Sequence, residues 1–180
     1  MKTQKDQLWL KDYEDFIQAD GYEVPTATKD RVFNKILKLI NPSPLIVFLK
    51  ILGIHIGVGF LSLSVCHQFG MNPFNTERSL ADWMMSVGGH QVCMIGCGIL
   101  FVGISLLSAG YFLTIEEINS LKRTEFLQTL SLGLVSLGLF AAFGAELAIG
   151  IAGLWLLGGL IGGFVATETI FRLKQVRLSA

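Results

Sequence analysis

Apolar residues fill most of the sequence after residue 44, in stretches that charged residues rarely interrupt. A helix that crosses the hydrocarbon core of a bilayer needs about 20 predominantly apolar residues. Four stretches reach this length, at about 45–65, 92–113, 126–144 and 148–171. The pattern therefore predicts an all-α integral membrane protein, with a four-helix transmembrane bundle over residues 45–171 and a short tail over 172–180.

The last two spans come from a single apolar stretch. The 41 residues from Phe126 to Ala166 contain one charge, Glu146, and this length is roughly twice that of one span. Glycine relaxes the backbone where a chain must reverse. We therefore expect a tight reversal around Gly144–Gly150, with Glu146 reaching the lipid headgroups.

Composition agrees with this class. Hydrophobic residues make up 52% of the chain, charged residues 16%, and the mean hydropathy is +0.57, whereas a soluble domain carries about a quarter charged residues. Disordered chains are poor in apolar residues, so disorder is excluded. The 14 Lys and Arg balance the 14 Asp and Glu, so we expect no direct nucleic-acid binding.

Basic residues are distributed unevenly between the two sides of the predicted bundle. Eight lie ahead of or just inside the first span, two lie in the loop 114–125 and three lie in the tail, whereas the loop 66–91 has only Arg78. The positive-inside rule therefore places both termini in the cytoplasm. The simplest location is the bacterial cytoplasmic (inner) membrane, and a eukaryotic endomembrane is the alternative.

Residues 1–44 form a polar segment that precedes the first span, which we call the arm. The arm contains two candidate amphipathic helices, one over about 5–19 and one that opens after Thr26 or Thr28, with a break at 20–25 between them. The second helix has an apolar stripe opposed by basic residues. The stripe consists of Val32, Phe33, Ile36, Leu37 and Ile40. It lies either on anionic membrane lipids or in a groove of a soluble cytoplasmic partner.

The outward loop, residues 66–91, is bounded by residues that bind metals. Two ligand pairs flank it: Cys66 with His67, and His90 with Cys93. Thiolate and imidazole together suit zinc or copper. Two alternatives stay open: a Cys66–Cys93 disulfide that leaves Cys97 free, and ordinary small or interfacial residues. Within the loop, a short helix over about 77–87 is expected to lie on the outer leaflet.

A few ionisable residues fall inside or beside the predicted spans. His55 lies near the middle of the first span, where ionisable groups are functional candidates. It is either a proton-linked or haem-ligating imidazole, or a neutral ring bonded to a Ser or Thr of a neighbouring helix. Glu168 is expected to pair with Arg172 one turn later. Glu117, in the inner loop, is expected to be solvated.

Glycines spaced four apart provide small faces on two spans. One pair is Gly53 and Gly57 in the first span, and the second set lies in the fourth span. The second set comprises Gly158, Gly159, Gly162 and Gly163. Such faces allow close helix approach in membranes. They are compatible with a compact bundle or a homo-oligomer.

No sequence signature of a nucleotide-binding, hydrolase or zinc-protease site is present, so we expect no enzyme. The layout of a helical cytoplasmic arm before compact spans is similar to that of membrane-tethered anti-sigma regulators, a likeness of architecture without a shared motif. It favours a regulatory or sensory protein, in which the outward Cys/His loop is coupled to an arm that binds a soluble partner. The alternative is a small transporter, or an accessory subunit of a membrane complex, for a metal or another small solute.

Overall fold

The chain is described by a computed structural model that covers residues 4–18, 25–77, 79–145 and 147–179. It divides into two compact units, residues 1–37 and 38–180. The first unit holds helix α1 (Gln4–Gln18) and most of helix α2 (Thr26–Ile40). Both helices of the arm are therefore present. The break predicted at 20–25, apart from Pro25, lies outside the described residues, as does Glu146.

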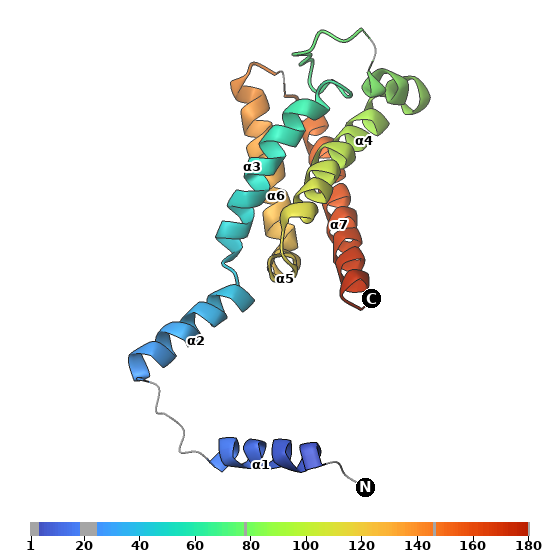
Figure 1. Cartoon of the computed structure of the whole chain (residues 1–180). Coiled ribbons are helices and arrows are strands. Elements are labelled where there is room, and N and C mark those ends of the chain that lie inside the picture. The colour runs from blue at the N-terminus through green and yellow to red at the C-terminus, as the bar shows by residue number, and fades with distance from the viewer. Residues whose placement is uncertain (1–3, 19–24, 78, 146, 180) are drawn as a thin grey trace. The chain divides into compact units, whose positions relative to one another are not determined.

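The second unit is a helical bundle (Figure 1). Its helices are α3 (Pro44–Ser62), α4 (Leu80–Phe112), α5 (Ile115–Arg123), α6 (Glu125–Ala142) and α7 (Ile149–Ser179). By length and composition, α3, α4, α6 and α7 are long and apolar enough to cross a membrane. The predicted all-α class with four long apolar helices is thus confirmed.

Helices α4 and α7 share the most extensive contact in the bundle, and glycines make their close approach possible. A Cβ atom on Gly98 would lie 2.0 Å from the Trp155 carbonyl oxygen, and one on Gly158 would lie 2.1 Å from the Ile95 carbonyl oxygen. Gly162 faces α4 in the same way. Without side chains at these positions the two backbones touch, and dispersion contacts stabilise the pair.

The other predicted glycines have different surroundings. Gly159 faces the Val102 side chain, and Gly163 faces Thr129 of α6. Gly53 and Gly57 on α3 are exposed, and no atom lies within 4 Å of where their Cβ atoms would be. The four predicted glycines of α7 therefore serve packing within the chain, whereas Gly53 and Gly57 of α3 face open space.

Three local features differ from the sequence expectations. The short helix expected at 77–87 begins at Leu80, and a kink at Gly89 (φ 70°), where the backbone is not helical, separates it from the rest of α4. The loop 114–125 contains α5, which was not predicted. Glu117 on α5 is buried rather than solvated, because it forms an ion pair with Lys50 of α3. The reversal after α6 comes where expected, at Gly144 (φ 87°).

Candidate functional site

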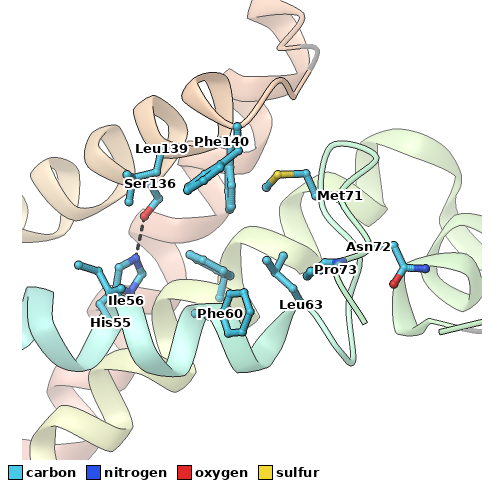
Figure 2. A pocket seen from close by; sticks show the side chains of 13 residues that line it. His55, Ile56, Phe60, Leu63, Met71, Asn72, Pro73, Ser136, Leu139 and Phe140 are labelled. Carbon is cyan, nitrogen blue, oxygen red and sulfur yellow. Dashed lines mark hydrogen bonds between the residues drawn. The ribbon is translucent and has the colours of Figure 1, made fainter. Parts of the chain in front are cut away.

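A cavity of about 530 Å³ lies between α3 and α6 (Figure 2). Thirteen residues line it, and its walls are almost entirely apolar. Helix α3 and its C-cap contribute His55, Ile56, Gly59, Phe60 and Leu63, and the outward loop contributes Met71, Asn72 and Pro73. The other lining residues are Phe101 of α4 and, from α6 and its C-cap, Ser136, Leu139, Phe140 and Phe143. This volume is in the range of small-molecule sites.

His55 is the ionisable residue in this wall, and it is 3% exposed. Its Nε2 atom lies 2.7 Å from the Ser136 hydroxyl of α6 (Figure 2), and its ring contacts the Phe101 ring edge-on at 5.1 Å. Among the described residues, no group bonds to its Nδ1 atom. The bond to a serine of a neighbouring helix is the contact that one of the two sequence alternatives expected.

The outward loop closes one end of the cavity. Asn72 holds the loop in a turn, because its side chain accepts from the Thr76 backbone N–H at 3.1 Å and donates to the Thr76 carbonyl at 3.0 Å. Phe69 (φ 51°) and Asn75 (φ 50°) adopt left-handed backbone conformations. For a bulky Phe this conformation is costly and persists only where the surroundings impose it. The turn over residues 68–76 thus forms a cap at this end of the cavity.

Gln68 anchors that cap in the bundle. Its side chain is buried and accepts a hydrogen bond from the indole N–H of Trp155, which is itself fully buried in α7. Phe69 packs beside it, with its ring 5.5 Å from Phe140 and 6.0 Å from Trp155. Two loop side chains therefore reach into the aromatic cluster that backs the cavity.

All three cysteines of the chain lie together near this cap. The Cys66 and Cys97 sulfurs are 2.7 Å apart, and those of Cys93 and Cys97 are 4.0 Å apart. All three are buried free thiols. Cys66 therefore lies nearest to Cys97. The partner considered from the sequence was Cys93, which lies one turn before Cys97 on α4.

The two histidines of the predicted metal set form no metal-binding group with the cysteines in the described residues. The Nε2 atom of His67 bonds to the Thr76 hydroxyl, and His90 is exposed, next to the Gly89 kink. Within the part of the chain that the structure describes, no group of three or more His, Cys, Asp or Glu side chains fits a metal ion. The expected four-residue zinc or copper site gains no support from this arrangement.

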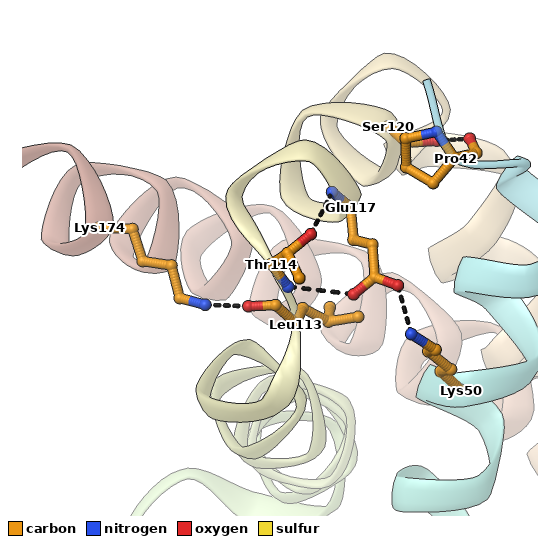
Figure 3. A network of polar contacts seen from close by, with 7 residues as sticks. All are labelled: Pro42, Lys50, Leu113, Thr114, Glu117, Ser120 and Lys174. Atoms are coloured by element: carbon orange, nitrogen blue, oxygen red, sulfur yellow. Dashed lines mark hydrogen bonds and ion pairs between the residues drawn. The ribbon is translucent and has the colours of Figure 1, made fainter. Parts of the chain in front are cut away.

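A polar network joins the helices at the opposite end of the bundle (Figure 3). Lys50 of α3 pairs with Glu117 of α5, and Glu117 also accepts from the Thr114 backbone N–H at 3.0 Å in a capping box. Burial alone would raise the pKa of Glu117, but the bonds from Lys50 and Thr114 outweigh it and hold the pKa below its usual value. The buried carboxylate is therefore charged and paired.

Further contacts extend this network to α7 and to the hinge before α3. The Lys174 ammonium donates to the Leu113 carbonyl at the end of α4, and the Ser120 hydroxyl donates to the Pro42 carbonyl at 3.2 Å (Figure 3). The predicted Glu168–Arg172 pair is present at 2.8 Å. Glu168 also pairs with Lys122 of α5 at 2.8 Å, which connects α5 to α7.

The apolar stripe of α2 is fully on the surface. Every residue of Thr26–Ile40 is exposed, and the five stripe residues range from 46% to 64% exposed. In α1, aromatic residues are exposed as well, and the rings of Trp9 and Tyr13 stack at 5.7 Å. Both arm helices therefore present apolar surface.

Several residues of this site have no clear signal in the sequence. Ser136, Gln68 and Cys97 acquire their roles from contacts between distant segments. Only α5 had a local signal, since Thr114 and Glu117 have the spacing of a capping box.

No protein family, curated protein or solved structure matched this chain when it was compared with them.

Proposed function

We propose that this chain is a non-enzymatic, multi-pass membrane regulator whose arm binds a soluble cytoplasmic protein. The observation that carries the proposal is the exposed apolar surface on both arm helices, which belong mainly to a compact unit of their own. An amphipathic helix that shows its apolar face to water gains free energy when a groove covers it. A segment of this size is too small to build a stable core alone.

The charge of α1 favours a protein over a lipid surface as the partner of the arm. Asp12, Glu14 and Asp15 are exposed on α1, next to the exposed rings of Tyr13 and Phe16. Anionic lipids repel such a helix. The basic helix α2 would bind anionic lipid by itself, so the two helices together fit a protein groove better than a membrane surface.

Contacts at the start of α3 provide a route between the arm and the bundle. The hinge residue Pro42 bonds to Ser120 of α5, and Lys50 pairs with Glu117 of the same helix. Helix α3, which carries Lys50, continues to His55 and the cavity. A conformational change near the cavity would therefore be passed along α3 to the hinge. This coupling would connect the outward loop to the arm.

Photo-crosslinking in cells tests the arm as a protein-binding element. A photoreactive amino acid replaces Phe33 in the full chain, and adducts are analysed after the membranes are solubilised. We expect an adduct with a soluble protein that is lost when Val32→Asp and Ile36→Asp are added. The matched control adds two acids outside the stripe, Thr28→Asp and Asn34→Asp, and should keep the adduct. Adducts with lipid alone would contradict the proposal.

Reporter fusions test the orientation that the proposal requires. A reporter active only in the cytoplasm, joined after residue 180 or placed ahead of residue 1, should be active in both fusions. The same reporter inserted at Asn75 in the outward loop should be inactive. Opposite results for the two termini would remove the cytoplasmic partner from consideration.

A second candidate function is that of a subunit in a membrane complex, including a small transporter. It is favoured by the open space at Gly53 and Gly57 on the exposed face of α3. A neighbouring helix could approach closely there. Substitution of Gly57 by Leu should then lower the mass of the particle in native mass spectrometry, and Gly153→Leu on α7, also in open space, should not.

A further inference from the structure

The cavity between α3 and α6 is an elongated slot with a buried aromatic floor (Figure 2). The floor consists of Phe101 and Phe140, which line the cavity and are each 5% exposed. The bond between His55 and Ser136 joins the two helices at one end of the slot, and Met71 of the outward loop lies at the other. From His55 to the end of α3 the chain rises by about 12 Å. This length is close to the hydrocarbon depth of one leaflet, about 15 Å.

The open side of the slot lies on the outer surface of the two helices. Its rim consists of Ile56 and Phe60 of α3 and of Leu139 and Phe143 at the end of α6, which are 41% to 78% exposed. Exposed apolar residues continue the same surface along both helices, among them Ile46, Leu49, Leu127 and Leu134. Both helices are long and apolar enough to cross a membrane. In a bilayer the rim therefore borders acyl chains rather than water.

The lining of the slot offers apolar contact rather than polar recognition. No Asp, Glu, Lys or Arg side chain lines it. The Nε2 atom of His55 is bonded to Ser136, and the Asn72 side chain is bonded to the Thr76 backbone. A charged or strongly polar ligand would lose its hydration without compensation. The lining therefore selects a hydrocarbon.

An empty slot with such walls is unfavourable, and this decides its occupant. Apolar cavities stay dry and take up apolar molecules instead, because atoms that face a void lose their dispersion contacts. The volume of about 530 Å³ is in the range of drug-sized ligands. At the rim, acyl chains are the surrounding medium and hence the most concentrated hydrocarbon. They reach the floor sideways, between α3 and α6, without crossing water.

We infer that this slot binds an acyl chain of a membrane lipid, which enters between α3 and α6 and lies against Phe101 and Phe140. The inference concerns the bundle alone and goes beyond the proposed function, because it holds whether or not the arm binds a protein. It distinguishes this part of the α3–α6 surface, where a chain reaches buried side chains, from the remaining surface, which lipids only surround.

Photolabelling from within the bilayer tests the inference. The full-length protein is placed in phosphatidylcholine vesicles that contain a phosphatidylcholine with a diazirine at the middle of one acyl chain. Illumination releases dinitrogen, and the resulting carbene inserts into a C–H bond of a side chain that the acyl chain touches. Peptide sequencing by mass spectrometry then locates each adduct on the chain.

We expect adducts on the two floor residues, although both are buried. Leu106 of α4 and Leu132 of α6 are matched controls, because they are at most 1% exposed and lie outside the cavity. They should stay unlabelled, whereas their exposed neighbours Leu107 and Leu134 should be labelled and so show that the carbene reaches this depth. Unlabelled floor residues, as when a helix of a second copy fills the slot, would overturn the inference. Equal labelling of the floor and of Leu106 and Leu132 would overturn it as well.

Two pairs of substitutions test entry through the rim. Ile56→Phe with Leu139→Phe narrows the rim and should remove most of the adducts on Phe101 and Phe140. Ile46→Phe with Leu134→Phe adds the same rings to exposed positions on the same helices, outside the cavity, and should leave the floor adducts unchanged. Equal effects of the two pairs would refute the assignment of the slot as the binding site.

Discussion

The α4–α7 contact provides the sharpest test of the fold, because a single methyl group should separate the two helices. In Gly158→Ala the new Cβ atom would lie 2.1 Å from the Ile95 carbonyl oxygen, whereas ordinary contacts begin at 3.4 Å. One backbone must therefore retreat by about 1.3 Å. The nearest atoms are all backbone atoms of Ile95 on α4, so no side-chain rotation relieves the clash.

The size of the effect follows from the lost contacts. A gap of about 0.5–1 Å already removes a quarter to a half of the dispersion energy of facing atoms, and overpacking typically costs about 1–3 kcal/mol. For a chain of this length, that corresponds to a fall in the unfolding midpoint of roughly 2–12 °C. The thermal unfolding of the detergent-solubilised protein, followed by size-exclusion chromatography of heated samples, measures it.

Gly153→Ala is the matched control on the same helix. No atom lies within 4 Å of its added Cβ, and alanine favours the helix by up to about 1 kcal/mol over glycine. This variant should be as stable as the parent or slightly more stable. If Gly158→Ala unfolds at the same temperature as Gly153→Ala, the close approach of α4 and α7 described above is wrong.

Three further predictions concern the polar groups of the bundle. Because the pKa of Glu117 is lowered in the folded protein, its contribution to stability is complete above the ordinary carboxyl pKa of about 4.3 and is lost as pH falls through the lowered value. Glu117→Gln should therefore remove this part of the fall in unfolding midpoint at acid pH. An unchanged dependence of the midpoint on acid pH would contradict the ion pair. The oxidant diamide should take two electrons and two protons from the Cys66 and Cys97 thiols, which join in a disulfide. Peptide mapping without reductant should detect the Cys66–Cys97 cross-link. A disulfide between another pair of cysteines would contradict the observed proximity of Cys66 and Cys97. Ser136→Ala removes the partner of the buried Nε2 atom of His55 and should cost about 1–3 kcal/mol in urea unfolding. Ser108→Ala, at a half-buried hydroxyl that bonds to the Ile104 carbonyl of its own helix, should be near neutral. Similar losses for both would count against the buried bond.

The cavity was beyond the reach of sequence reasoning, although one of its key residues was not. His55 was identifiable because an imidazole in the middle of an apolar span is rare and costly. Its partner Ser136 is an ordinary serine in another span, 81 positions away. Which serine faces the histidine depends on the rotation of α3 and α6 about their axes, and hydropathy does not encode that rotation.

The thiols illustrate the same limit at the scale of one helical turn. Cys93 and Cys97 lie four residues apart and so share a face of α4. The sequence therefore allowed either to meet Cys66. In the folded chain Cys97 lies nearer to Cys66, and Gln68, two residues after Cys66, bonds to Trp155 of α7. Contacts of this kind between distant segments are not encoded in the local sequence.

The sequence by itself determined the four long apolar helices, the reversal at Gly144 and the amphipathic arm, because each depends on the composition of one continuous segment. The tertiary structure alone decided the contacts between segments: the backbone contact at Gly158, the burial of Glu117 against Lys50, and the cavity beside His55. The physical reason is that transfer into an apolar environment is a sum over local residues. The mutual rotation and depth of helices are instead fixed by packing among residues far apart in the chain.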